Sequence, residues 1–264
     1  MAEVRRMSAI LKVEGLGKRF GGLAALSDVH FEAEEGQITG LIGPNGAGKT
    51  TCFNLITGTL AASAGRVMFR GENIAGLPPH RVVERGLART FQSATTFPTA
   101  SVRENIVRGA LLRHQVGTLA SIIGGGSARD AVRAAEETVV DVMDALELTA
   151  YADREAGTLA YGHQKRLGVA IGLATRPALL LLDEPAAGLN PEEVDRFGSM
   201  LTTLQQRFHL SVLIVEHHMR LIMRICDHIV VLHHGEKIAE GSPGMVQKDP
   251  RVIEAYLGAE HHVE

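Results

Sequence analysis

The segment ITGLIGPNGAGKTTCFNLI, residues 38–56, decides the fold of this chain. Its centre, residues 43–50, fits the P-loop pattern G-x-x-x-x-G-K-[ST]. An apolar run that is typical of a buried strand, Ile38–Ile42, comes directly before the pattern, and Thr50–Ile56 can form a helix after it. Strand, glycine-rich turn and helix are the context that the pattern requires, so the segment predicts a phosphate-binding loop.

The residue types of this loop suit ATP. Glycines let backbone N–H groups turn toward an anion at a helix N-terminus, where the helix dipole is positive. Lys49 can reach the β- and γ-phosphates, and the hydroxyl of Thr50 can bind Mg²⁺. The candidate nucleotide-binding residues are Gly43, Pro44, Asn45, Gly46, Ala47, Gly48, Lys49, Thr50 and Thr51. Cys52 follows them, and we expect it to be a small buried apolar residue rather than a reactive thiol.

A second motif, ALLLLDEP at residues 178–185, is an apolar strand that ends in two acids. A carboxylate at the end of a core strand beside a P-loop can hold Mg²⁺ through water, which is the role expected for Asp183. Glu184 is expected to face the other way and to polarise the attacking water. Two solvated acids at a strand end are common in proteins. The roles predicted for Asp183 and Glu184 therefore depend on the presence of the P-loop in the same chain. The chain has no Asn-Lys-x-Asp guanine-reading motif, which argues against a GTPase.

Apolar, β-branched runs recur along the chain, and helix-periodic segments such as Pro191–Arg207 lie between several of them. The candidate strands are Val29–Phe31, Ile38–Ile42, Val67–Phe69, Leu179–Leu182, Val212–Val215 and Ile229–Leu232. Alternating strands and helices predict an α/β fold with a largely parallel, buried sheet. Two further helices are expected at Val102–Leu112 and Ala128–Leu146, with a glycine-rich break at Gly124, Gly125 and Gly126 between them. This stretch is interpreted as a helical insertion.

The composition narrows the possible partners. The 264 residues carry a formal net charge of -3, which disfavours nucleic acid as a partner. Two cysteines, Cys52 and Cys226, make a disulfide framework unexpected and indicate a reducing compartment. No apolar run approaches the ~18 residues that span a bilayer. We therefore expect a soluble protein that meets a membrane only through a partner.

Together the motifs resemble the ATPase subunits of ABC transporters, over nearly the whole chain. Residues 18–26, KRFGGLAAL, are similar to the family's A-loop region, in which Phe20 would stack on adenine; an ordinary core phenylalanine is the alternative. Residues 89–92, RTFQ, are similar to the Q-loop. The resemblance implies that Gln92 senses Mg²⁺ and the γ-phosphate, and that the following segment, about Ser93–Val107, meets the permease.

Residues 159–164, LAYGHQ, occupy the place of the family signature LSGGQ. The signature opens a helix whose N-terminal amides bind the γ-phosphate on a partner subunit, here through Ala160, Gly162 and His163. The chain departs from the pattern at Ala160, Tyr161 and His163. Because Ala160 has no hydroxyl, the phosphate contact would come from backbone amides alone.

Two more elements of the family follow. Residues 187–190, AGLN, stand at the D-loop position, with Asn190 where the family usually has Asp. Residues 213–217, LIVEH, resemble the H-loop, in which His217 would contact the γ-phosphate, with His218 as the neighbouring alternative. A metal site made of these histidines, His233 and His234 is disfavoured, because adjacent pairs lack the i, i+4 spacing.

The resemblance implies a P-loop NTPase (RecA-like) core with a mainly parallel sheet, an N-terminal antiparallel β subdomain and an inserted α-helical subdomain. It implies one ABC ATPase domain over residues 1–264, with the nucleotide-binding core in 1–92 and 176–264. Residues 93–175 would form the helical subdomain that carries the signature. The implied ligands are ATP and Mg²⁺, with Glu184, His217 and Gln92 in hydrolysis and Thr50, Gln92 and Asp183 around the metal.

Finer features resemble the ATPase subunits of branched-chain amino-acid importers: RTFQ, the Ala-Tyr-Gly signature, EPAAGLN at 184–190 and VIEAYLG at 252–258. The implied partners are permease subunits, an identical or related second ATPase that completes an ATP sandwich and, indirectly, a solute-binding protein. The implied location is the cytoplasmic face of the inner membrane. Importers of urea, amides or organic acids and lipopolysaccharide export remain alternatives, as do a non-transport ABC ATPase and a hydrolysis-deficient regulatory subunit.

Overall fold

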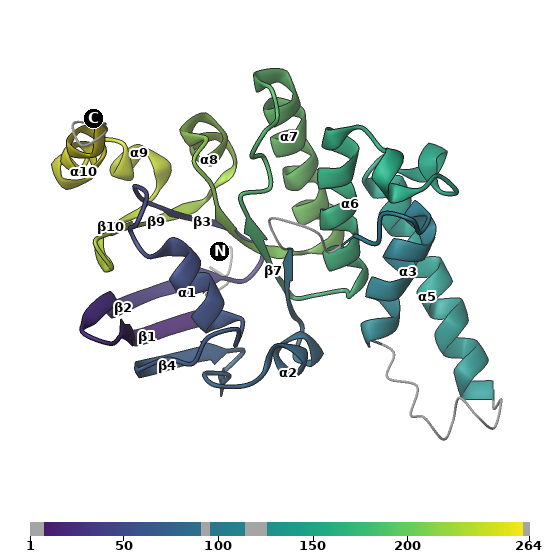
Figure 1. The fold of residues 1–264 in the computed structure, drawn as a ribbon, viewed down its shortest axis with the longest axis horizontal. Helices are drawn as coiled ribbons and strands as arrows, with labels where there is room; N and C mark the ends of the chain where they lie inside the picture. Colours follow the sequence, from purple (N-terminus) through teal and green to yellow (C-terminus); the bar gives the residue numbers. More distant parts are fainter. Residues whose placement is uncertain (1–7, 91–95, 114–125, 261–264) are drawn as a thin grey trace, which may run out of the picture.

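Two β-sheets organise the computed structural model of the chain, which describes residues 8–90, 96–113 and 126–260 (Figure 1). The larger sheet has the strand order β10-β9-β3-β8-β7-β6, and all its pairs are parallel except β10 with β9. Its strands are β3 (Ile38–Ile42), β6 (Leu87–Thr90), β7 (Leu179–Asp183), β8 (Ser211–Val215), β9 (His228–His233) and β10 (Glu236–Gly241).

The smaller sheet is antiparallel and has the order β2-β1-β4-β5. Its strands are β1 (Ala9–Phe20), β2 (Leu23–Glu34), β4 (Ala64–Phe69) and β5 (Glu72–Asn73). It lies beside α1 (Lys49–Ile56), which follows β3 directly. This sheet is the antiparallel N-terminal part that the resemblance implied, and the prediction of it is confirmed.

Burial explains why the central strands have almost no polar residues. Every residue of β3, β7 and β8 is buried, because both faces of the larger sheet are covered. Alternate residues of β7 enter different clusters: Leu179 and Leu181 pack with Phe53 of α1, while Leu180 and Leu182 pack with residues such as Phe197. One continuous apolar run therefore serves two cores.

The remaining helices are α2 (Pro79–Glu84), α3 (Val102–Arg113), α5 (Gly126–Ala145), α6 (Tyr161–Ala174), α7 (Pro191–Phe208), α8 (Met219–Ile225), α9 (Pro243–Val246) and α10 (Pro250–Glu260). Of these, α2 packs in the same apolar cluster as α1, and the others lie on the opposite face or at the two ends of the larger sheet (Figure 1). Helices α3, α5 and α6 pack against one another as a group. Among the helices of the described residues, none combines the length and the apolar character needed to cross a membrane.

Most of the elements expected from the sequence are confirmed. Each of the six candidate strands lies within an observed strand, and the helices expected in 102–112, 128–146 and 191–207 are present. The expected glycine-rich break is wrong at Gly126, which is the first residue of α5. Gly124 and Gly125 lie outside the described residues.

Helix α7 begins with a complete capping box. The side chain of Asn190 accepts a hydrogen bond from the N–H of Glu193, and the Glu193 carboxylate accepts one from the N–H of Asn190, both at 2.9 Å. Pro191 occupies the first turn, where its missing N–H costs nothing. Asn190 thus has a clear structural role at the place where the family usually has Asp.

Replacing Asn190 with Ala is expected to lower the free energy of unfolding by about 1 kcal/mol, because an N–H of the first turn loses its acceptor. Chemical denaturation measures the change. Ser199→Ala is the control, since Ser199 lies inside the same helix and its hydroxyl bonds only the carbonyl of the preceding turn. Equal losses in the two variants would contradict a capping role.

Candidate functional site

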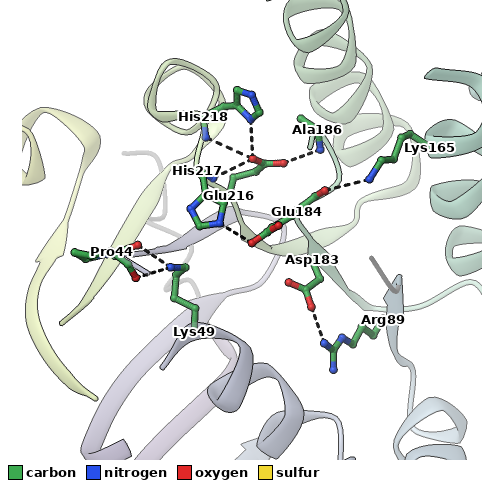
Figure 2. A network of polar contacts seen from close by, with 11 residues as sticks. Pro44, Lys49, Arg89, Lys165, Asp183, Glu184, Ala186, Glu216, His217 and His218 are labelled. Carbon is green, nitrogen blue, oxygen red and sulfur yellow. Dashed lines mark hydrogen bonds and ion pairs between the residues drawn. The ribbon is translucent and has the colours of Figure 1, made fainter. Parts of the chain in front are cut away.

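The pairing of three parallel strands brings distant segments of the chain together. Val215, at the end of β8, pairs with Leu41 of β3 on one side and with Asp183 of β7 on the other. The loop after β3, the acids after β7 and the histidine after β8 therefore meet at one edge of the sheet (Figure 2). This is the edge at which open parallel sheets bind ligands.

A cavity of about 460 Å³ opens at this edge. Seven consecutive loop and helix residues line it, together with residues from β2 and from the ends of other strands. The lining residues are Leu23, Ala24, Ala25, Asn45, Gly46, Ala47, Gly48, Lys49, Thr50, Thr51, Glu184, His217 and His234. Of these, Leu23, Ala24, Ala25 and His234 were not among the predicted nucleotide-binding residues; the sequence signal of His234 is its position directly after a buried strand.

The loop geometry depends on glycine and on Lys49. Gly48 caps α1 with φ = 100°, and a Cβ there would lie 2.7 Å from Leu26 Cδ2. The first N–H groups of a helix lack intrahelical acceptors, which suits them to an anion. The Lys49 ammonium donates to the carbonyl of Gly43 at 2.7 Å and to that of Pro44 at 2.9 Å. Gly43 and Pro44 thus bind the Lys49 side chain and are not among the residues that line the cavity.

Electrostatics around Lys49 combine two opposed effects. Burial lowers the pKa of Lys49, while the carboxylates of Glu184 and Asp183 oppose that change. Burial is the larger effect, so the pKa lies below its usual value. A phosphate that arrived in the cavity would add negative charge beside the ammonium and would favour its charged form.

Glu184 adopts an unusual backbone conformation, with φ = 47°, in the left-handed region that few non-glycine residues visit. Its N–H donates to the carbonyl of Val215 at 2.9 Å. Its Oε1 lies 2.5 Å from Nε2 of His217 (Figure 2). Asp183 turns instead toward Arg89, so the two neighbouring acids face different partners, as the sequence predicted.

Glu216 is a buried residue that sequence reasoning missed. Its carboxylate accepts hydrogen bonds from the N–H of Ala186 at 2.6 Å and from that of His217 at 3.0 Å. Its Oε2 also lies 3.0 Å from Nδ1 of His218. Glu216 thereby joins the loop after β7 to the loop after β8, and it keeps His218 away from the cavity that His217 lines.

Two of the three residues expected around Mg²⁺, Thr50 and Asp183, belong to the described part of the chain. Thr50 lines the cavity. Asp183 is buried at the end of β7, and its carboxylate lies close enough to Lys49 to oppose the lowering of that residue's pKa by burial. A hydroxyl and a carboxylate are hard oxygen donors of the kind that Mg²⁺ prefers. The residues present therefore fit the metal. Gln92, the third expected donor, lies outside the described residues.

The signature residues lie apart from this cavity. Helix α6 begins at Tyr161, directly after Ala160, which provides no side-chain cap. The Tyr161 hydroxyl donates to the carbonyl of Ala187 at 3.1 Å, and the His163 ring packs against Tyr151. None of Ala160, Gly162 and His163 is among the residues that line the cavity.

Phe20 stands at the end of β1, and 48% of it is exposed. The alternative that Phe20 is an ordinary core residue is therefore wrong. Its ring lies 5.1 Å from the ammonium of Lys18. Phe20 does not line the cavity itself, although Leu23, three residues further along the same hairpin, does.

Comparisons with known proteins identify relatives of the whole chain. A family model described as "ABC transporter" matches residues 26–187, and one described as "Branched-chain amino acid ATP-binding cassette transporter" matches residues 236–262. The high-affinity branched-chain amino acid transport ATP-binding protein BraF of Pseudomonas aeruginosa is 43% identical over 249 residues, which cover 94% of this chain and 98% of BraF. LivG of Escherichia coli, named for the same transport, is 38% identical over the same shares.

Solved structures agree in fold. A nucleotide-free ATP-binding cassette from an ABC transporter has a TM-score of 0.82 and 30% identity, and the match covers 94% of this chain and 99% of that one. A cassette in its ADP conformation has a TM-score of 0.81 and 32% identity, with 95% and 99% covered. The α/β fold expected from the sequence is thus confirmed.

Cys52 lies within α1, fully buried, and burial raises the pKa of its thiol to about 12. Burial also raises the pKa of Cys226.

The Cys52 thiol is expected to react slowly in the native protein. With a pKa of about 12, only about one Cys52 thiol in ten thousand would be ionised at pH 8. Labelling of the native protein by a thiol reagent is therefore expected to be at least ~100-fold slower than labelling in denaturant. Cys226→Ser isolates the Cys52 signal. Rapid labelling of that variant in its native state would contradict the assignment of Cys52 as an inert apolar residue.

Proposed function

The chain belongs to the ABC transporter family of ATP-binding subunits, and on that premise we propose that it hydrolyses ATP to power an importer of branched-chain amino acids. The observation that carries the ATPase is the meeting of Lys49, Glu184 and His217 in one cavity. The cargo is supported by BraF and LivG, which are named for branched-chain amino acid transport, and by the family match over residues 236–262.

We propose that the triphosphate of ATP lies on the N-terminus of α1. The open N–H groups of the first turn would bind the β-phosphate, and Lys49 would exchange its two carbonyl partners for phosphate oxygens. The exposure of Phe20, on the hairpin that contributes Leu23 to the cavity, supports the proposal that its ring stacks on adenine.

We propose that Thr50, Asp183 and Gln92 hold Mg²⁺ beside the phosphates. The ion would neutralise charge that develops on the phosphate oxygens. The hydroxyl of Thr50 and the carboxylate of Asp183 supply donors of the right kind on two sides of the triphosphate. Gln92 enters this proposal through the Q-loop resemblance alone.

Glu184 is proposed as the residue that orients and polarises the attacking water. Support comes from its position in the cavity and from its short contact with His217, which holds the carboxylate in one orientation. His217 would contact the γ-phosphate from the same side.

The separation of the signature from the cavity supports an ATP sandwich. Ala160, Gly162 and His163 lie at the start of α6, away from the residues that surround Lys49 in the same chain. We propose that they serve the cavity of a second ATPase subunit, identical or related, while that subunit's signature serves this cavity. ATP would then close the dimer, and hydrolysis would reopen it.

The proposed location is the cytoplasmic face of the membrane, against permease subunits that receive their solute from a binding protein. The segment expected to meet the permease, about 93–107, includes Phe97, which is 55% exposed. Arg108 places its guanidinium 4.0 Å from the centre of that ring.

We propose that the chain divides into two parts. The nucleotide-binding core would comprise residues 1–92 and 176–264, and the helical subdomain residues 93–175. The packing of α3, α5 and α6 against one another as one group supports this division.

Glu184→Gln is expected to lower the rate of ATP hydrolysis by ~10²–10⁴-fold, because the amide cannot accept the proton of the attacking water. ATP binding should persist, so a dimer should accumulate with ATP, as measured by light scattering after gel filtration. Glu192→Gln, an exposed residue in the first turn of α7, is the control and should behave as wild type. Wild-type turnover in Glu184→Gln would remove Glu184 from this role.

The cargo is tested in cells whose only copy of this chain carries Glu184→Gln. Uptake of labelled leucine is expected to collapse, because the motor no longer completes its cycle, while an unrelated solute enters normally. Unchanged leucine uptake, in cells without another leucine importer, would leave the ATPase in place and reject branched-chain amino acids as the cargo.

A further inference from the structure

The buried carboxylate of Asp183 has a partner that lies far from it in sequence. Arg89, the third residue of β6, donates from Nη2 to Asp183 Oδ2 at 2.6 Å (Figure 2). The side chains of Arg89 and Asp183 are only 8% and 5% exposed. The pair links β7 to β6, on the side of β7 opposite β8, the strand that precedes His217.

The other arm of the guanidinium is held as well. Nη1 of Arg89 donates to Asn54 Oδ1 at 2.6 Å and lies 3.4 Å from Thr57 Oγ1. The guanidinium also lies 5.7 Å from the ring centre of Phe53. Arg89 therefore joins β6 and β7 to α1, the helix whose N-terminus forms the phosphate loop.

A gain in folding stability does not by itself account for a buried pair such as Arg89 and Asp183. Removing two charges from water costs free energy that their attraction only partly offsets, and apolar side chains of similar volume often serve a core at least as well. The fork geometry does something that apolar residues cannot do. A planar guanidinium that is bonded at both ends fixes the direction of the carboxylate it binds.

We propose that Arg89 is a positioning residue for Asp183: it binds one carboxylate oxygen and leaves the other directed toward Mg²⁺ at the nucleotide. The inference rests on the proposed function, because it assumes that the cavity takes a metal–nucleotide complex. Groups that orient a metal-binding carboxylate typically change metal affinity 10–100-fold when they are replaced.

The test measures Mn²⁺, as a paramagnetic substitute for Mg²⁺, by the loss of its free electron paramagnetic resonance signal in the presence of ADP. Arg89→Lys keeps the charge that Asp183 needs but loses the fork. We expect Mn²⁺ to bind ~10-fold more weakly to this variant. ADP affinity in EDTA is expected to stay within about twofold of wild type, because the hydrogen bonds described for Arg89 go to Asn54 and Asp183, outside the phosphate loop.

A second variant protects the test against loss of folding. Asn54→Ala leaves the pair between Arg89 and Asp183 intact and removes the acceptor at the far arm of the fork. It is expected to weaken Mn²⁺ in the same direction, by ~3-fold. Arg224→Lys is the matched control, since its guanidinium binds Asp195 at 2.8 Å and the Asp195 carbonyl at 2.6 Å on α7, outside the cavity. Mn²⁺ binding should not change in that control.

The outcomes separate the inference from the function on which it rests. Unchanged or tighter Mn²⁺ binding in Arg89→Lys, with only a lower unfolding temperature, would assign Arg89 a purely structural role and overturn the inference. Failure of the wild-type protein to bind ADP with Mn²⁺ or to hydrolyse ATP would reject the proposed function itself.

Discussion

The parallel pairing of β3, β8 and β7 is the constraint on which the rest of the site depends. Parallel strands point the same way, so their carboxyl ends meet at one edge, and the shared partner Val215 sets how far each strand reaches. Because both faces of these strands are buried, polar groups can stand only where the strands end. The phosphate loop, the acids and the histidine are therefore close together through the topology, before any side-chain contact is made.

Each charged group at that edge already has a partner in the structure. Lys49 is held by two carbonyls, and Glu184 is held by His217. Hydrogen bonds to charged groups are worth about 1.5–3 kcal/mol, so leaving one unmade in a partly buried site would be costly. In the proposed mode of ATP binding, phosphate oxygens would replace the two carbonyls at Lys49, so the ammonium would keep hydrogen-bond partners throughout. The pKa of Lys49 reflects the same balance: burial lowers it, and the carboxylates of Glu184 and Asp183 oppose that change.

Sequence reasoning succeeded where one short segment carries the whole signal. The strand, loop and helix around residues 38–56 and the strand that ends in Asp183 and Glu184 depend on contiguous residues, and His217 does line the cavity. It missed the roles of Arg89 and Glu216, because each acts through a partner on another strand, and strand register is not visible in a single sequence. It also missed β1 as a long strand and β10, whose alternating polar residues give no continuous apolar run. The nucleotide, metal and catalytic roles of all the site residues, Phe20 and Gln92 included, stay predictions.

Packing in the same chain accounts for Tyr161, one of the departures from the family signature. Gly188 has φ = 81°, and a Cβ on it would lie 2.9 Å from the Tyr161 ring, so the ring fits only because residue 188 is glycine. The Tyr161 hydroxyl bonds the carbonyl of Ala187, and the Lys165 ammonium lies 3.5 Å from the carbonyl of Glu184. The start of α6 is thus attached to the loop that carries Glu184. A displacement of this helix end would either break both contacts or move residues 184–188 with it, so the start of α6 and the loop that carries Glu184 are linked within one chain.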